Sequence, residues 1–321
     1  MTHDSQTWLA LSGGVGGAKL ALGLVRALED PSRLMIAANT GDDFEHLGLT
    51  ICPDIDTLMY TLAGLNNPET GWGRAGETAT FMTAVAALGG ETWFHLGDGD
   101  LATHVARSHR LAAGETLSSV TAALAQRLGI QADIVPMTDD VVRTIVETEG
   151  GDLALQHYFV REQCVPRVLG FRYAGGGDAV ANSRILERLA DTSLGAIIIC
   201  PSNPYISIDP ILAIPGLRRA IEASAAPVIA VSPIVGGHAL KGPTAKMMLE
   251  RGVEPSATTV ARHYGDLLDG FIIDEVDEAE AAGIAATGTE VVVAKTVMND
   301  LGDRIALAGE VLAFVERLRG H

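Results

Sequence analysis

The chain has 321 residues, 47% hydrophobic and 20% charged, which is typical of a globular protein with a substantial core and excludes a disordered chain. Its 23 basic and 40 acidic residues give a formal net charge of −17, which argues against a nucleic-acid partner. No apolar run reaches the ~18 residues of a membrane span, no signal peptide is recognisable, and three scattered cysteines form no disulfide ladder, so we expect a cytoplasmic protein without a membrane partner.

Strand and helix patterns alternate through the first 130 residues. The apolar run Thr7–Ser12 predicts a buried strand, Gly13–Gly17 a loop, and the apolar stripe within Ala18–Glu29 a helix. Further strands are predicted over residues 33–40 and 93–96, and further helices over residues 56–63, 78–88 and 101–111. Thr116 is expected to cap the next helix.

Residues 131–178 show a different pattern. β-like runs over residues 142–148 and 153–160 flank Gly150 and Gly151, a pair typical of a turn. This pattern predicts a smaller, inserted β-rich lobe.

The alternation then resumes towards the C-terminus. Strands are predicted over residues 195–200, 227–232, 271–274 and 290–294, and helices over residues 217–223, 245–251, 258–268 and 305–318. We therefore expect an α/β fold with a mostly parallel sheet and helices on both faces, formed by residues 1–130 and 179–321. In such folds ligands bind beyond the carboxyl ends of the strands, so the loops after the strands are the places to search.

The first of these loops is rich in glycine. Gly13, Gly14 and Gly16 follow a strand and precede a helix, where backbone N–H groups and the helix N-terminus favour phosphate. The spacing matches neither a P-loop nor a strict dinucleotide-binding motif. A tight strand-to-helix turn is the alternative to phosphate binding.

The next two loops are acidic. Asn39-Thr-Gly-Asp-Asp43 follows the second strand, and Asp54 and Asp56 lie at a helix entry. Asp43, Asp54 and Asp56 together could hold Mg²⁺ through oxygen ligands, or one of them could act as a general base. A solvated acidic turn and helix capping are the alternatives.

A third acidic segment precedes the helix predicted over residues 101–111. Asp98 and Asp100 are expected either to cap that helix or to face the site. His104 and His109 lie on the same helix, and we expect them at the surface or behind the site rather than in catalysis.

Later loops supply small polar and basic side chains. Ser202 and Asn203 follow a very apolar strand and suit phosphate or base recognition. Lys241 and Lys246 could balance phosphate charge, with two surface lysines as the alternative.

Together these loops resemble a known family, the 2-phospho-L-lactate transferases of deazaflavin coenzyme F-420 biosynthesis. The matching segments run in order over nearly the whole chain: Ser12–Lys19, Asn39–Asp43, Ile51–Thr57, Gly71–Gly73, Leu96–Asp98, Leu101–His104, Pro201–Pro204, Ser207–Ile208 and Val231–Ile234. No single segment is decisive, but the ordered set is specific.

The resemblance implies a Rossmann-like fold with an extra lobe in a homodimer. The donor would be the guanosine diphosphate ester of a three-carbon acid, either phospholactate, phosphoenolpyruvate or phosphoglycerate. The acceptor would be the ribityl hydroxyl of 7,8-didemethyl-8-hydroxy-5-deazariboflavin. GMP would be released, and Mg²⁺ would be the cofactor.

The resemblance also implies roles for individual residues. The expected substrate-binding set is Ser12, Gly13, Gly14, Gly16, Asn39, Gly41, Asp98, Ser202, Asn203 and Lys241. Asp43 and Asp54 are expected to bind the metal, and Asp56 and Asp54 to act on the ribityl hydroxyl during in-line attack. One departure is Gly99, because the family commonly has a basic residue at this position.

Two other functions compete with the transferase. A sister group of similar fold is regulatory and binds nucleotide sugars or dinucleotides without turnover, but Gly71–Gly73 and Pro53–Asp56 are features we associate with the transferases. An NAD-dependent dehydrogenase is disfavoured by the glycine spacing and by Asn39, which stands where an acidic ribose ligand is usual.

Overall fold

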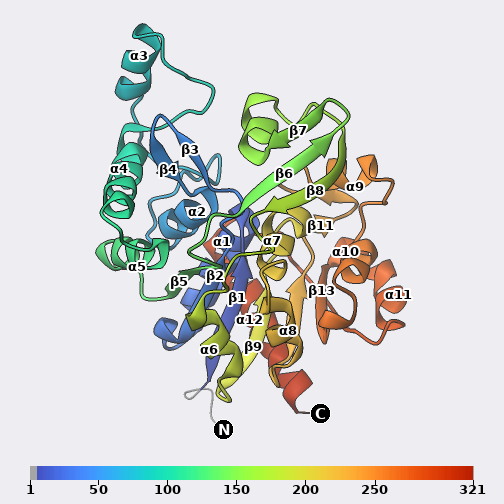
Figure 1. Ribbon diagram of the computed structural model, residues 1–321. Helices are drawn as coiled ribbons and strands as arrows, with labels where there is room; N and C mark the ends of the chain where they lie inside the picture. The colour runs from blue at the N-terminus through green and yellow to red at the C-terminus, as the bar shows by residue number, and fades with distance from the viewer. Residues whose placement is uncertain (1–5, 321) are drawn as a thin grey trace.

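The computed structural model describes residues 6–320. A seven-stranded sheet forms its centre in the order β14-β13-β10-β9-β1-β2-β5, and each neighbouring pair of strands is parallel (Figure 1). The strands are β1 Thr7–Ser12, β2 Leu34–Ala38, β5 Asp133–Pro136, β9 Leu194–Ile199, β10 Val228–Val231, β13 Gly270–Asp274 and β14 Glu290–Ala294. The predicted α/β class and parallel sheet are confirmed.

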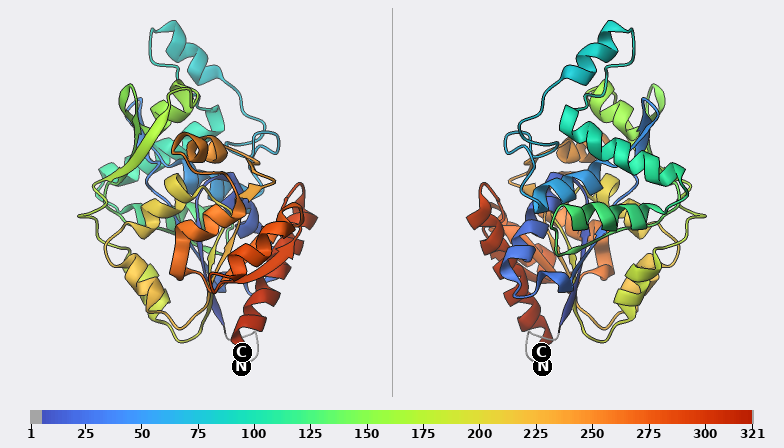
Figure 2. Two further views of the ribbon diagram at one scale, coloured as in Figure 1. Left: turned by 90° about the vertical axis from the view of Figure 1, so that its right-hand side faces the viewer. Right: turned by 90° about the vertical axis from the view of Figure 1, so that its left-hand side faces the viewer.

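Helices cover both faces of this sheet (Figure 2). The α-helices are α1 Gly14–Ala27, α2 Pro53–Leu62, α3 Thr80–Ala87, α4 Asp98–Ala112, α5 Leu117–Arg127, α6 Ser183–Ala190, α7 Asp209–Leu212, α8 Leu217–Glu222, α9 Thr244–Glu250, α10 Ala257–Tyr264, α11 Ala281–Ala285 and α12 Leu301–Arg319. Of these, α3 projects away from the sheet (Figure 1). Because side chains alternate along β1, Leu9 and Leu11 join the core with α6, α8 and α10, whereas Trp8 and Ala10 join the core with α1, α2 and α12. Both faces of the strand are therefore buried, as its continuous apolar sequence predicts.

The strand order reverses between β1 and β9. Strands β2 and β5 continue the sheet on one side of β1, and β10, β13 and β14 continue it on the far side of β9. The two central strands pair with Leu11 beside Ile199, so the loops that leave them start at the same edge. A crevice forms at such a reversal, and it is the usual ligand position of these folds.

A three-stranded antiparallel sheet of β6 Arg143–Thr148, β7 Gly151–Ala154 and β8 Val168–Ala174 lies above this edge (Figure 1). The predicted lobe boundary at residue 131 is wrong, because β5 pairs in parallel with β2 in the main sheet. The β-like run expected over residues 153–160 also ends early, since His157–Arg161 forms a π-helical turn.

Several local predictions change in the structure. The loop expected over Gly13–Gly17 is shorter, because α1 already begins at Gly14. Residues 93–96 form no strand; instead Phe94 packs edge-on against Phe44, with ring centroids 4.8 Å apart, beside the hairpin of β3 Phe44–His46 and β4 Leu49–Ile51. Thr116 caps α5 as predicted, accepting a hydrogen bond from the backbone of Ser119. Within residues 6–320, no helix combines the length and the apolar character of a membrane span.

Candidate active site

A cavity of about 810 Å³ lies where the strand order reverses. Its wall contains residues that directly follow three neighbouring strands: Gly13 and Gly14 after β1, Pro201 and Ser202 after β9, and Ser232 after β10. The sheet thus places short polar loops around one space, and Gln156, Phe159 and Val160, at the π-helical turn after β7, also line it.

Close packing explains most of the glycines at the start of α1. A Cβ at Gly13 would lie 2.5 Å from a carboxylate oxygen of Asp54, and one at Gly16 would overlap the carbonyl oxygen of Pro201. Gly14 differs, because its φ of +65° requires a left-handed backbone and a Cβ there would meet open space. Gly14 is therefore where the backbone itself faces the cavity.

Buried side chains occupy the first N–H groups of this segment. Gly13 N donates to Ser202 Oγ at 3.2 Å, and Gly14 N donates to Asp54 Oδ1 at 2.7 Å. The Asp54 carboxylate lies at the N-terminus of α1, where a negative charge is favoured. A ligand phosphate at this end would therefore meet the remaining amides of the first turn rather than those of Gly13 and Gly14.

Asn39 holds two buried carboxylates together at this end of the cavity. Its Nδ2 lies 2.8 Å from Asp42 Oδ1 and 2.9 Å from Asp54 Oδ2. Burial raises the pKa of Asp54 to about 6 against the hydrogen bonds from Asn39 and Gly14. Burial and the nearby charge of Asp54 raise the pKa of Asp42 well above its usual range. Two such carboxylates would ionise readily around a divalent cation, which supplies the missing counter-charge.

Asp43 lies behind this pair and does not line the cavity. It is buried, and its Oδ1 has no hydrogen-bond partner among residues 6–320. Burial raises the pKa of Asp43 to about 7, although a hydrogen bond with Cys52 and the charges of Arg143 and Arg107 lower it. The carboxylate that faces the cavity with Asp54 is therefore Asp42, its neighbour in sequence.

Asp56 is held by a buried arginine. Arg107 Nη1 donates to Asp56 Oδ2 at 3.1 Å, and Arg107 Nη2 donates to Asp56 Oδ1. Arg107 is fully buried, so this bidentate pair is shielded from solvent. Both oxygens of Asp56 are thus engaged, although the residue lines the cavity.

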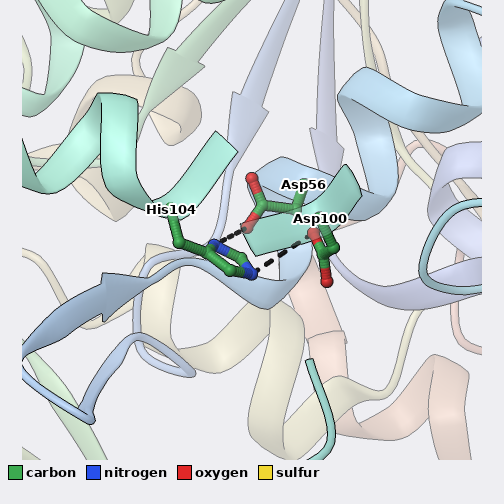
Figure 3. A group of neighbouring side chains, drawn as sticks. All are labelled: Asp56, Asp100 and His104. Atoms are coloured by element: carbon green, nitrogen blue, oxygen red, sulfur yellow. Dashed lines mark ion pairs between the residues drawn. The ribbon is translucent and has the colours of Figure 1, made fainter. Parts of the chain in front are cut away.

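His104 connects this pair to a third carboxylate (Figure 3). Arg107 Nη1 lies 3.3 Å from His104 Nδ1, and since a guanidinium only donates, Nδ1 accepts and the ring proton is on Nε2. His104 Nε2 lies 3.2 Å from Asp100 Oδ1, which also accepts a 2.6 Å hydrogen bond from Tyr60. Burial alone would raise the pKa of Asp100, but the adjoining His104 ring and the Tyr60 hydroxyl hold it below its usual range.

The ligand atoms of Asp56, Asp100 and His104 lie within 4.8 Å of one another, the one group of three or more such residues in the described chain with an arrangement that could hold a metal ion. The donor set is mixed, and Mg²⁺ prefers oxygen ligands. His104 Nδ1 and both oxygens of Asp56 are also engaged by Arg107. Asp42 and Asp54 also line the cavity and offer oxygen ligands alone, and the groups that contact them, Asn39 and the Gly14 N–H, carry no charge.

The sequence matches the family described as 2-phospho-L-lactate transferase CofD over residues 9–306. The chain belongs to this family. It is accordingly an enzyme of the 2-phospho-L-lactate transferase type, as the ordered motifs predicted.

Individual members of the family cover nearly the whole chain. The chain is 40% identical over 317 residues to the phosphoenolpyruvate transferase of Kitasatospora aureofaciens, covering 97% of this chain and 98% of the relative. It is 40% identical over 324 residues to that of Thermobifida fusca, with 97% and 98% coverage, and 39% identical over 294 residues to that of Mycolicibacterium smegmatis, with 85% and 89% coverage.

Solved structures support the fold alone. Two crystal structures of a Bacillus halodurans protein, one of them titled a member of the UPF0052 family, superpose with TM-scores of 0.65 and 0.63 at 14% and 12% identity. Each comparison covers 96% of this chain and 99% of the other.

Eight of the residues that the sequence predicted at the site line the cavity. They are Gly13, Gly14, Gly16, Asp54, Asp56, Ser202, Asn203 and Lys241. Ser12, Asn39, Gly41, Asp43 and Asp98 do not. Asn39 supports the acidic pair from behind and accepts a hydrogen bond from Gly41 N. Asp98 turns towards α3, where it accepts from the backbone of Thr80 and Phe81 at 3.2 and 3.0 Å.

On the inward face of α4 the sequence analysis named Asp100 and His104 but missed Arg107. Asp100, His104 and Arg107 are spaced i, i+4 and i+7, which places them on one side of a helix. His104 is 1% exposed, so of the two positions expected for it the surface is excluded and the place behind the site remains. Polar residues at this spacing on one side of a predicted helix could have indicated a buried polar cluster.

Gly99, where the transferase family commonly has a basic residue, is crowded by a neighbouring loop. Its N–H donates to Glu77 Oε2 at 2.6 Å, and a Cβ there would lie 2.9 Å from Glu77 Oε1 and 3.4 Å from Arg74 Nε. Arg74 also lies over the Tyr60 ring, 5.5 Å from its centroid. A guanidinium is thus present beside Gly99, although it comes from another segment.

Proposed function

We propose that this enzyme transfers a phosphoenolpyruvyl group from its guanosine diphosphate ester to the ribityl hydroxyl of 7,8-didemethyl-8-hydroxy-5-deazariboflavin, releasing GMP, in coenzyme F-420 biosynthesis. The observation that carries the proposal is the cavity in which buried carboxylates, the start of α1 and a lysine meet at the strand-order reversal. These are the groups that phosphoryl-group transfer without a covalent enzyme intermediate needs.

The names of the relatives support phosphoenolpyruvate as the three-carbon acid. Relatives at 40% identity over almost the full chain are called phosphoenolpyruvate transferases. Phospholactate and phosphoglycerate are the alternative three-carbon acids of the donor.

Asp42 and Asp54 would hold Mg²⁺ in this proposal. Both line the cavity, both are buried, and their raised pKa values show how poorly the site tolerates two negative charges alone. The ion would neutralise charge on the donor phosphates. Asn39 fixes the two carboxylates relative to each other through its amide nitrogen.

Asp100 is the carboxylate best placed to orient the acceptor hydroxyl and accept its proton. It lines the cavity, and its Oδ1 accepts a hydrogen bond from Tyr60 and lies 3.2 Å from His104 Nε2, while none of the described residues donates to its Oδ2. Asp56, the group expected from the sequence, has both oxygens bound by Arg107. We therefore assign Asp56 to positioning: it fixes Arg107, and Arg107 sets the tautomer of His104.

Aromatic side chains offer a surface for the flat deazaflavin ring. Trp72, Trp93, Phe94 and Phe159 line the cavity, and Trp72 is 56% exposed. Planar ligands bind by stacking on such side chains. The acceptor ring would lie against them, with its ribityl chain reaching towards Asp100.

The test is GMP release that depends on the acceptor. Purified protein, Mg²⁺ and the phosphoenolpyruvyl donor are incubated with and without the deazariboflavin, and GMP is measured by chromatography. The proposal predicts stoichiometric GMP and phosphodiester only when the acceptor is present. GMP release at an equal rate without acceptor would indicate a hydrolase and contradict it.

A further inference from the structure

The lysines of this chain divide into two kinds. The sequence contains four: Lys19, Lys241, Lys246 and Lys295. Lys246 pairs with Glu250 at 2.6 Å and Lys295 with Asp303 at 2.7 Å, and neither lines the cavity. Lys19 and Lys241 do line it, and neither has a carboxylate within ion-pair distance among residues 6–320.

Lys19 is held inside the cavity wall by a neutral group. Its Nζ donates to the carbonyl oxygen of Met298 at 2.8 Å, which leaves two N–H donors for another partner. Burial, Arg304 and Lys241, in that order, lower the pKa of Lys19. Arg304 also carries a buried Nε without a hydrogen-bond partner in the described chain. Lys19 is thus a partly buried cation close to two others, Arg304 and Lys241, in a chain with a net charge of −17. Such a cluster of cations favours the binding of an anion.

Lys19 lies on α1 at a different point along the helix axis from the one that Asp54 contacts. Asp54 contacts Gly14, the first residue of the helix, and Lys19 lies five residues later, about 7.5 Å along the axis. In an in-line displacement the nucleophile and the leaving group lie on opposite sides of the phosphorus. In the proposed function Asp100 serves the incoming hydroxyl, and Asp42 and Asp54 hold the ion beside the transferred group. The two lysines of the cavity are then the cations that remain for the group that leaves.

We propose that Lys19 and Lys241 form the subsite that binds the phosphate of the departing nucleoside monophosphate. This assignment rests on the proposed function. The acceptor hydroxyl oxygen bonds to the phosphorus of the transferred group, and the bond from that phosphorus to the bridging oxygen breaks. The bridging oxygen leaves with its electron pair on GMP, where the two ammonium groups balance the charge, and the hydroxyl proton passes to Asp100.

The experiment measures binding of GMP and of guanosine to the full-length protein by calorimetry, with no donor or acceptor present. We compare Lys19→Met, Lys241→Met and the wild type, with Lys295→Met as a control for the same loss of charge outside the cavity. Loss of a charge-assisted hydrogen bond should raise the Kd of GMP about tenfold or more in the first two variants and leave guanosine binding unchanged. Lys19→Arg should bind GMP more tightly than Lys19→Met.

Two results would overturn the subsite. The first is a GMP affinity in Lys19→Met and Lys241→Met equal to that of the Lys295→Met control, or no GMP binding by the wild type. The second is unchanged GMP affinity combined with a raised KM for the donor, which would assign the lysines to the carboxylate of the three-carbon acid. Lysine-dependent GMP binding in a protein that forms no phosphodiester would keep the subsite and reject only the transfer reaction.

Discussion

Arg107 binds both carboxylate oxygens of Asp56 inside the protein, directly behind the cavity. The side chain of Arg107 is fully buried, and that of Asp56 is 7% exposed. Removing one member of such a pair leaves the other charge buried without a partner, which costs far more than the pair itself contributes. The pair is therefore expected to control stability as well as the geometry of His104.

Arg107→Met should lower the free energy of unfolding by about 3–5 kcal/mol, because it leaves Asp56 charged and unpaired in the interior. Urea denaturation at pH 7 measures the loss. Arg110→Met is the matched control on the same helix, since its ion pair with Glu115 is partly exposed and should contribute much less to stability. Equal losses in the two variants would contradict the buried pair.

Asp100→Asn should lower kcat by about 10²–10⁴-fold, the usual contribution of a positioned proton acceptor. GMP affinity should be unchanged, because the carboxylate acts on the acceptor. Tyr60→Phe removes one of the hydrogen bonds to Asp100 but keeps the carboxylate, so its effect should be smaller. Steady-state kinetics with the deazariboflavin decide the matter, and a kcat for Asp100→Asn within twofold of the wild type would exclude the role.

Mg²⁺ should raise the thermal stability of the wild type but not of Asp42→Asn. An ion present at 100 times its Kd adds about 2.7 kcal/mol to the free energy of unfolding. Without Mg²⁺, Asp42→Asn should be at least as stable as the wild type, because it removes one of two close buried carboxylates. Differential scanning fluorimetry with and without Mg²⁺ tests both points.

His104→Gln separates the two candidate metal sites. If Asp42 and Asp54 hold the ion, this variant keeps its Mg²⁺-dependent rise in Tm, measured against its own metal-free baseline. Loss of the rise in His104→Gln with retention in Asp42→Asn would place the ion at Asp56, Asp100 and His104 instead.

The ion pair of Lys295 with Asp303 should make stability depend on pH. Hydrogen bonds from Lys295 and from the backbone of Asn299 lower the pKa of Asp303 to about 2. A carboxylic acid whose pKa is lower in the folded state stabilises that state at pH values above its unfolded pKa of about 3.9. The stabilisation is lost as the pH falls towards 2. Asp303→Asn should therefore be less stable than the wild type at pH 7. The difference in Tm between the two proteins should narrow below about pH 4, and a constant difference from pH 3 to pH 7 would contradict the linkage.

The order of elements was predictable because each main strand is a short apolar run between helical patterns. The segment 93–96 misled the prediction, since its aromatic residues pack against Phe44 in a small cluster rather than in the sheet. The sequence analysis assigned β5, Asp133–Pro136, to the inserted lobe because this strand directly precedes the lobe in the chain. Only its pairing with β2 shows that β5 belongs to the main sheet. Sequence pattern gives the type of an element more readily than its partner.

The site was predictable at the level of loops rather than of side chains. The pattern Gly-Asp-Asp marks an acidic loop, but which of Asp42 and Asp43 faces the cavity depends on the backbone direction after β2. Several glycines at the start of α1 are required by packing on Pro201 and Ser202, a contact between segments far apart in the chain. Arg107 was missed because a buried arginine is recognised only once its partner Asp56 is placed beside it.

The most direct test of the central claim offers the enzyme three donors in equal amounts: the guanosine diphosphate esters of phosphoenolpyruvate, phospholactate and phosphoglycerate. With Mg²⁺ and limiting deazariboflavin, the products are identified by mass spectrometry. The account predicts that the phosphoenolpyruvyl phosphodiester predominates, with one GMP released for each molecule formed. Predominance of another adduct would contradict the donor assignment, and the absence of any adduct would contradict the transfer itself.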